Sequence, residues 1–221
     1  MGIKQNLNYI KSQLPQHVTL VAVSKTKPNS DIMEAYDAGH RVFGENKIQE
    51  MVEKYEELPK DIEWHMIGHV QTNKVKYMAH FVHLIHGVDN YKLLKEIDKQ
   101  AQKHNRVVHC LLQIKIASED SKFGMTANEA EEILVSKEFS ELEYVKIVGV
   151  MGMATFTSNE NIIRKEFLNL KHVFDSFKKY KKYNTDFQII SMGMSSDYPL
   201  AIECGSNMVR IGSSIFGSRN Y

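Results

Sequence analysis

The sequence has few cysteines, and their scarcity argues against a small disulfide-rich protein. Cys110 and Cys204 are the only cysteines in 221 residues, and they form no CxxC pair. A framework of disulfides is therefore not expected. Cys110 lies within a predicted strand, where a buried and unreactive thiol is the better interpretation.

Long apolar runs, a secretion signal and a charge excess are also lacking. No apolar stretch is long enough to span a bilayer, and the N-terminus lacks the basic-then-apolar layout of a signal peptide. We therefore expect a soluble, cytoplasmic protein with no membrane partner. The 28 basic and 27 acidic residues nearly cancel, so no general field favours nucleic acid. A hydrophobic fraction of 43% indicates a full core.

Strand-like and helix-like stretches alternate along the whole chain. The predicted strands span residues 18–24, 41–44, 62–68, 81–86, 107–116, 145–151, 187–192 and 208–211. The predicted helices between them include residues 31–38, 46–57, 91–103, 127–137 and 161–180. Eight such repeats favour a closed α/β structure, the (β/α)8 TIM barrel, with an open doubly wound sheet as the alternative.

The first strand–helix turn argues against the open sheet. It reads Ser24-Lys-Thr-Lys-Pro28 and contains none of the glycines of a dinucleotide-binding turn. An extra helix is predicted over residues 2–14, before the first strand, and Pro15 closes it. No linker or low-complexity tract suggests a boundary, so we expect one domain over residues 1–221.

Lys25 is the most informative residue, because it follows the apolar run of residues 18–24 directly. In a parallel barrel it would lie at the carboxyl end of a strand, where active sites of this fold collect. A lysine that is partly desolvated there loses some preference for its charged form. Lys25 is therefore a candidate amine nucleophile.

Two turns near the C-terminus resemble phosphate-binding loops. Gly193 and Ser195 follow the seventh predicted strand, and Gly212 and Ser213 follow the eighth. Loops after strands seven and eight often hold phosphate in this fold, through backbone amides at the start of a short helix. The alternative is that the serines only cap helices.

Arg210 lies inside the last apolar strand and needs a partner if it is buried. An ion pair with Glu203 is one interpretation. The other is cofactor binding, because pyridoxal 5′-phosphate (PLP) needs an amine, an anion cradle and a group that faces its ring nitrogen. Lys25, the two turns and Arg210 would supply these three.

Six stretches, in order, resemble the YggS-like pyridoxal phosphate homeostasis proteins over nearly the whole chain. They are AVSKTKP at 22–28, FGENKIQE at 43–50, WHMIGHVQTNK at 64–74, SKFGM at 121–125, GVMGMAT at 149–155 and SMGMSSDYPLAIECGSNMVRIGSSIFG at 191–217. The resemblance implies a barrel like the N-terminal domain of alanine racemase, with PLP as a Schiff base on Lys25. It also implies a role in intracellular vitamin B6 homeostasis, without an established turnover reaction.

The resemblance also implies a set of cofactor-binding residues. Asn46 and Met151 would lie against the ring and Arg210 near its nitrogen, while His69 would lie on the same rim or cap the following helix. The residues expected at the phosphate are Ser191, Ser195, Gly212 and Ser213. Two positions depart from the family pattern: Lys115 stands where Asn is more usual and could place a second amine nearby, and Ser213 replaces the commoner Thr.

Three functions fit these residues. The first is a carrier that holds PLP reversibly, because an arginine beside the ring nitrogen makes a weak electron sink. The second is a PLP-dependent racemase or lyase of fold-type III. Such an enzyme needs a second base, and nothing in the spacing of Tyr36, Tyr77 or Tyr198 aims one at Lys25. The chain also ends at Tyr221 without the extra domain that supplies this base in alanine racemase. The third is a phosphate-binding isomerase without PLP.

The resemblance leaves partners open. Other B6 vitamers and transient contact with PLP-dependent apo-enzymes are expected, and a monomer is favoured. Metal ligation is not indicated, because the histidines show no HxxxH or HExxH pattern. His80, His83 and His86 are interpreted as positions along one strand and its approach.

Overall fold

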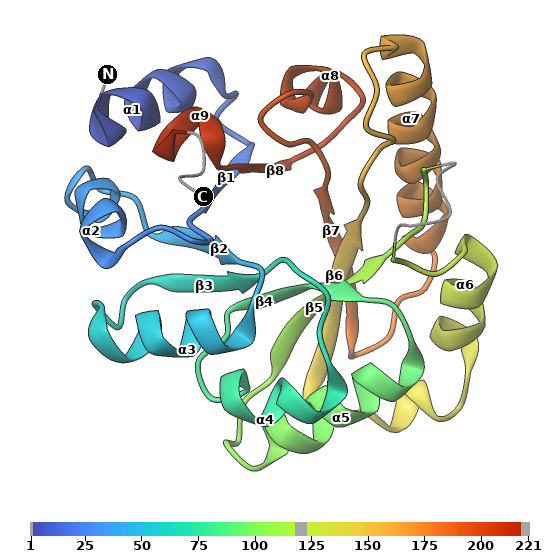
Figure 1. The fold of residues 1–221 in the computed structure, drawn as a ribbon. Coiled ribbons are helices and arrows are strands. Elements are labelled where there is room, and N and C mark those ends of the chain that lie inside the picture. The colour runs from blue at the N-terminus through green and yellow to red at the C-terminus, as the bar shows by residue number, and fades with distance from the viewer. Residues whose placement is uncertain (1, 118–122, 218–221) are drawn as a thin grey trace.

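Eight parallel strands close into a barrel, and helices lie around its outside (Figure 1). The computed structural model describes residues 2–117 and 123–217. Each strand pairs with the next in chain order, and β8 closes the ring against β1. The strands are β1 (Thr19–Val23), β2 (Val42–Glu45), β3 (Glu63–Met66), β4 (Leu84–Val88), β5 (Val108–Gln113), β6 (Val145–Met151), β7 (Thr185–Ser191) and β8 (Met208–Ile211). The prediction of a TIM barrel is confirmed.

Helices connect the strands, as parallel pairing requires. The α-helices are α1 (Ile3–Gln13), α2 (Asn29–Asp37), α3 (Ile48–Glu57), α4 (Val75–Met78), α5 (Tyr91–Gln102), α6 (Ala127–Val135), α7 (Glu160–Phe177), α8 (Tyr198–Glu203) and α9 (Ser213–Phe216). Two 3₁₀ helices, η1 (Thr72–Lys74) and η2 (Phe139–Glu141), complete the described elements. None of the helices in the described ranges is long and apolar enough to cross a membrane.

The core has two layers because side chains alternate between the faces of each strand. One layer fills the barrel interior and is formed by Val21, Leu84, Leu111, Val148, Met151 and Met208. The larger layer lies between the strands and the helices and includes Phe43 and Trp64, both fully buried. The position of a residue along its strand therefore decides whether it faces the interior or the helices.

The predicted extra helix is present as α1, and it contacts the last helix. The Asn6 side-chain amide donates a hydrogen bond to the Ile215 carbonyl at 3.0 Å, which ties α1 to α9. The backbone amide of Lys4 donates to Glu34 Oε1 at 2.9 Å, which ties it to α2. Since α9 follows the turn at Gly212, α1 supports one side of the barrel's carboxyl end.

Element boundaries differ from the predictions by a few residues. β5 ends at Gln113 rather than at residue 116, and the next residue, Ile114, forms an isolated bridge to Met125. α7 ends at Phe177 rather than at residue 180. The short helix α4 was not among the predicted helices. Of the SKFGM stretch at 121–125, residues 121 and 122 lie outside the described residues.

Candidate functional site

A cleft of about 610 Å³ opens at the carboxyl end of the strands. Its lining includes seven of the nine predicted site residues, namely Lys25, Asn46, His69, Ser195, Arg210, Gly212 and Ser213. Lys27 also lines it, and none of the described lining residues is Asp or Glu. Ile67, Met153 and Met194 add apolar surface. The cleft is therefore cationic and partly apolar, which suits an anion with a hydrophobic body.

A tight turn after β1 carries Lys25. The Lys27 amide donates to the Ser24 carbonyl at 3.1 Å, which closes the turn. Thr26 has a φ of +62°, a left-handed conformation that is unfavourable for a β-branched residue. Its amide donates to Glu50 Oε1 at 2.5 Å, and Lys27 Nζ donates to the Phe216 carbonyl at 2.8 Å. The turn is thus held in a strained shape from both sides.

A buried polar cluster between the barrel wall and α3 fixes the base of this turn. We call Ser24, Glu45, Glu50 and Lys54 the outer network. Lys54 Nζ donates to Glu45 Oε1 at 2.8 Å, to Glu50 Oε1 at 2.6 Å and to the Ser24 carbonyl at 2.9 Å. The Ser24 hydroxyl donates to Glu45 Oε1 at 2.5 Å. The residues on each side of Lys25 are therefore anchored to one buried cation.

Glu45 is fully buried, and burial is the main influence on its charge. Desolvation raises the pKa of Glu45 to about 6, although the Lys54 charge and the hydrogen bonds from Lys54 and Ser24 act in the opposite direction. Its second oxygen, Oε2, has no hydrogen-bond partner among the described residues. The carboxylate is therefore held at a cost in solvation.

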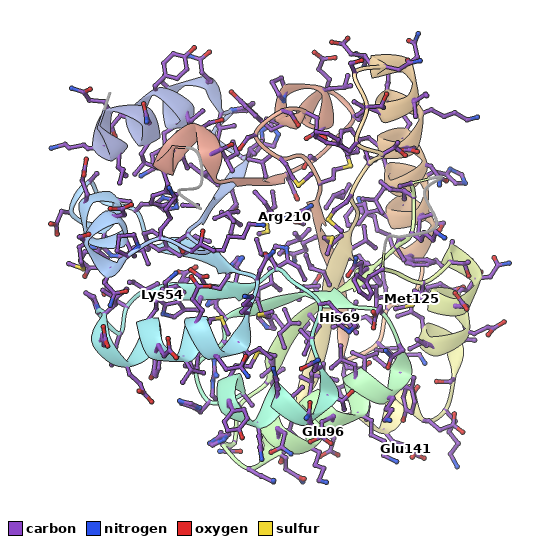
Figure 2. The ribbon with its side chains drawn as sticks, viewed as in Figure 1. Lys54, His69, Glu96, Met125, Glu141 and Arg210 are labelled. Carbon is purple, nitrogen blue, oxygen red and sulfur yellow. The ribbon has the colours of Figure 1, made fainter. Side chains whose placement is uncertain are left out.

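Arg210 lies in the centre of the barrel (Figure 2) and is only 4% exposed. Its Nη1 donates to the Ser191 carbonyl at 2.8 Å and to Ser191 Oγ at 2.6 Å, and its Nη2 donates to the Gly152 carbonyl at 3.1 Å. Burial lowers the pKa of Arg210 to about 10, an effect that the negative charge of Asp197 partly opposes. All three acceptors are neutral, so the guanidinium charge is not neutralised by them.

The alternative interpretation of Arg210, an ion pair with Glu203, is wrong. Glu203 instead pairs with Arg164, whose Nη2 lies 2.7 Å from Glu203 Oε2. Glu203 is the last residue of α8, outside the barrel, whereas the Arg210 side chain points to the interior. The charge of Arg210 is therefore available to the cleft.

A chain of polar side chains continues from Arg210 into the barrel interior. We call Arg210, Ser191, His86 and His65 the inner network. His86 Nδ1 lies 3.0 Å from Ser191 Oγ, and His86 Nε2 lies 3.0 Å from His65 Nδ1. Burial lowers the pKa of His65 to about 3 and that of His86 well below its ordinary value. Both imidazoles are therefore neutral near pH 7.

The two C-terminal turns lie against each other at the cleft. The Gly212 amide donates to Ser195 Oγ at 3.3 Å. Gly193 has a φ of +96°, and a Cβ there would lie 2.7 Å from the Ala201 Cβ. Only glycine fits this position. Ser213 begins α9, and the first amides of a helix have no carbonyl partner within the helix.

Asn46 and His69 form the opposite rim of the cleft. His69 Nδ1 lies 3.3 Å from Asp89 Oδ2, and its ring stacks on Phe123 with the centroids 4.3 Å apart. His69 does not cap the following helix, because Gln71 is the N-cap of η1. A Cβ on Gly68 would lie 2.4 Å from the Asn46 carbonyl oxygen, so glycine allows the loops after β2 and β3 to approach each other on this rim.

Two predicted site residues do not line the cleft. Met151 is buried in the barrel interior, and Met153, two residues further on, lines the cleft instead. Ser191 is also fully buried and accepts the hydrogen bond from Arg210 beneath the cleft. Lys115, expected as a possible second amine, is not among the lining residues either. Met151 and Ser191 therefore lie beneath the cleft rather than on its surface.

The cleft also contains residues that the sequence interpretation did not select. Lys27 could have been found by its place two residues after Lys25, on the same turn. Gln113 ends β5 and donates through Nε2 to the Phe123 carbonyl at 3.0 Å. Phe123 and Phe156 line the cleft from loops without regular structure, and no periodic pattern marks them.

The fold and the cleft together define an alanine-racemase-like (β/α)8 barrel with a lysine at the end of its first strand. A model of the N-terminal domain of alanine racemase matches residues 2–220. The chain belongs to this family, and within it to the pyridoxal phosphate homeostasis proteins, with which it shares well over a third of its residues along nearly the full length.

Three relatives illustrate the match. The pyridoxal phosphate homeostasis protein of Aquifex aeolicus (strain VF5) is 40% identical over 204 residues, which cover 91% of this chain and 87% of that protein. That of Escherichia coli (strain K12) is 36% identical over 211 residues, covering 94% and 88%. The structure of PipY from Synechococcus elongatus with PLP bound superposes with a TM-score of 0.88 at 33% identity, covering 97% of this chain and all of that one.

Alanine racemase itself is a more distant neighbour. The enzyme of Clostridium difficile 630 has a TM-score of 0.78 at 16% identity and covers all of this chain, which corresponds to 57% of the racemase. At this level of identity the likeness concerns the fold alone. It agrees with the closed barrel described above.

Proposed function

We propose that the protein binds PLP in the cleft, with a covalent link to Nζ of Lys25, and acts in B6 homeostasis as a reversible carrier. One observation carries the proposal: an amine, a buried guanidinium and two small-residue turns line one cleft that has no carboxylate among its described residues. A phosphorylated aromatic aldehyde needs such a donor set. The relatives named for this function, and PipY with PLP bound, support it.

Each part of the cleft has a separate task in this proposal. The turns at Ser195 and Gly212 hold the phosphate through backbone amides and hydroxyls. Arg210, held rigidly by Ser191, presents its guanidinium toward the ring nitrogen. When bound, the cofactor supplies an electrophilic aldehyde and an electron sink. Arg210 does not readily give up a proton, which weakens that sink and favours storage over turnover.

The lining of the cleft also favours a carrier over a racemase. A racemase of fold-type III needs a second base opposite the lysine, and no tyrosine is among the described residues that line the cleft. The Tyr36 hydroxyl, one of the candidates, donates to Asp61 at 2.8 Å outside the barrel. The racemase alternative therefore lacks support from the site.

The finer parts of the proposal rest on the same site. We include binding of other phosphorylated B6 vitamers, transient contact with apo-enzymes, a monomeric state and a cytoplasmic location. The residues 1–221 are taken as one cofactor-binding domain, which the family match over 2–220 supports.

Borohydride reduction followed by peptide mapping tests the covalent link. The full chain incubated with PLP should turn yellow and gain the mass of one reduced cofactor on the peptide that contains Lys25. Lys25→Ala should lose the adduct completely. Lys27→Ala is the matched control, because Lys27 lines the same cleft two residues away, and it should keep the adduct.

Two results would overturn parts of this proposal. A colourless protein, or an adduct that persists in Lys25→Ala, would exclude the link to Lys25. Exchange of the α-proton of amino acids in deuterated water separates carrier from racemase. Exchange well above that caused by free PLP would replace the carrier proposal with an enzymatic one.

A further inference from the structure

A second cavity lies at the opposite end of the barrel, near the amino ends of the strands. Its volume is about 280 Å³, and its lining includes Thr19, Glu63 and Leu84, the first residues of β1, β3 and β4. Three of its side chains, Glu63, His65 and His83, place one ligand atom each within 4.8 Å of one another. No other such group occurs in the described ranges 2–117 and 123–217.

The three side chains differ in exposure. His65 is 2% exposed, whereas the side chains of Glu63 and His83 are 46% and 50% exposed. His83 Nε2 lies 3.6 Å from Glu63 Oε2, and the rings of His65 and His83 stack with centroids 5.5 Å apart. The buried His65 side chain is thus fixed in place, whereas the half-exposed side chains of Glu63 and His83 have room to change position.

An unpartnered atom points to a missing ligand here. His65 Nε2 is buried and has no hydrogen-bond partner in the part of the chain that the structure describes, although His65 lines the cavity. Buried polar atoms of this kind are rare and unfavourable, costing about 1–3 kcal/mol each. The other ring nitrogen, Nδ1, is bonded to His86. The ring therefore cannot rotate to satisfy Nε2 without breaking the inner network.

The inner network also permits the tautomer that a metal needs. Arginine only donates, so Ser191 Oγ accepts from Arg210. If its other lone pair accepts from His86 Nδ1–H, then His86 Nε2 accepts from His65 Nδ1–H. This leaves the lone pair of His65 Nε2 directed at the cavity. Ligating histidines typically donate their second nitrogen in this way.

We infer that Glu63, His65 and His83 form a site for a divalent transition-metal ion, Zn²⁺ in the first instance. Two imidazoles and one carboxylate are a ligand set that zinc uses, with water in the fourth position. A tetrahedron with bonds of about 2.1 Å needs ligand atoms about 3.4 Å apart. Since the ligand atoms lie within 4.8 Å of one another, Glu63 and His83 must move by up to about 1.4 Å toward His65, and their exposure allows it.

The remaining charges of the cavity do not oppose a cation. Lys146 lies 3.5 Å from Asp186, which offsets its positive charge. His109 faces Leu84 across the β4–β5 pair and lines the same cavity, and it carries no amine that would exclude a cation. The ligands come from β3 and from the residue before β4, which explains why no HxxxH spacing appears in the sequence.

Metal titration of the full chain, without a histidine tag and after treatment with a chelator, tests the inference. Calorimetry with Zn²⁺ should show one ion per chain, and Co²⁺ should give the intense visible absorption of a four-coordinate ion. Glu63→Gln and His83→Asn should each weaken Zn²⁺ binding by more than the roughly 10–100-fold that loss of an outer-sphere partner costs.

His172→Asn is the matched control, because His172 is an exposed histidine on α7 and does not line the cavity. It should leave the affinity unchanged. Both test variants alter half-exposed side chains, so circular dichroism and thermal unfolding should show that they fold. The inference is overturned if no saturable binding occurs, or if binding is as tight in Glu63→Gln and His83→Asn as in the unmodified chain.

Discussion

Two buried polar networks stand on opposite sides of the barrel wall, and each fixes one cation of the cleft. The outer network joins Ser24, Glu45, Glu50 and Lys54 and anchors the turn that carries Lys25. The inner network joins Arg210 to Ser191, His86 and His65. Figure 2 shows Lys54 on α3, outside the ring of strands, and Arg210 within the ring.

The two networks differ in whether their buried cation is paired with carboxylates. The structural cation, Lys54, is neutralised by two carboxylates, at 2.8 Å and 2.6 Å. Arg210 instead donates to two carbonyls and a hydroxyl, all of them neutral, and the negative charge of Asp197 offsets its charge only in part. A buried charge that is only structural must be paired to be tolerated. Arg210, which has no carboxylate among its hydrogen-bond acceptors in the described residues, is the cation that lines the cleft, where an anionic ligand would neutralise it.

Removal of the structural cation should have the largest effect. Lys54→Met removes the cation paired with buried Glu45 and leaves that carboxyl only its hydrogen bond from Ser24; loss of one partner of a buried pair costs about 3–5 kcal/mol in other proteins. We therefore expect a loss of this size in the free energy of unfolding at pH 7.5, measured by urea denaturation. The loss should shrink below about pH 6, because Glu45, whose pKa is about 6, is then protonated in the unmodified chain and in the variant alike.

The matched control for Lys54→Met is Lys171→Met. Lys171 pairs with Asp175 one turn away on α7, and both side chains are partly exposed. Such surface pairs contribute about 0.5 kcal/mol or less. Equal losses in the two variants would show that the outer network is no more important than a surface pair. The double variant Lys54→Met/Glu45→Gln should recover much of the stability.

Disruption of the inner network should have a smaller effect on stability and a specific effect on the cleft. Ser191→Ala removes the acceptor of Arg210 Nη1 and of one His86 bond. Two buried groups then lose a partner, at about 1–3 kcal/mol each, although Arg210 keeps its bonds to two carbonyls. We expect a loss of about 2–3 kcal/mol, together with weaker PLP binding and a shifted absorption spectrum of the bound cofactor.

Ser206→Ala separates these effects. Ser206 is equally buried, and its hydroxyl is shared among the carbonyls of Ile190, Met192 and Met208. The carbonyls of Ile190 and Met208 keep backbone partners when it is removed. The variant should lose about 1 kcal/mol and keep the cofactor spectrum. A shift of equal size in both variants would mean that Ser191 does not position Arg210.

The sequence predicted the outline of the site because its signals are local. Lys25 and Gly212 each directly follow an apolar strand, and parallel strands bring such positions to one rim. The interior was harder to predict. Ser191 and Met151 occupy inward-facing positions one layer too deep, and the sequence does not reveal where a strand leaves the wall. The His65–His86 contact joins two strands and leaves no pattern along the chain.

A smaller effect than that of Lys54→Met or Ser191→Ala shows whether burial or the Lys54 charge dominates at Glu45. Burial raises the pKa of Glu45 from 4.5 to about 6. Between these values the folded chain binds more protons than the unfolded chain, so the contribution of Glu45 is fully present below about pH 4.5 and is lost as the pH rises to about 6. A difference of roughly 1.5 in pKa corresponds to about 2 kcal/mol.

The stability of the unmodified chain relative to Glu45→Gln should therefore fall by up to this amount between pH 4.5 and about pH 6. Glu129 supplies a control of opposite sign, because hydrogen bonds from Thr126 lower its pKa, so the stability relative to Glu129→Gln should rise with pH. If the Glu45 difference also rose with pH, then Lys54 would outweigh desolvation, and the carboxylate would be a net stabilising partner of the cation rather than a buried charge held at a cost.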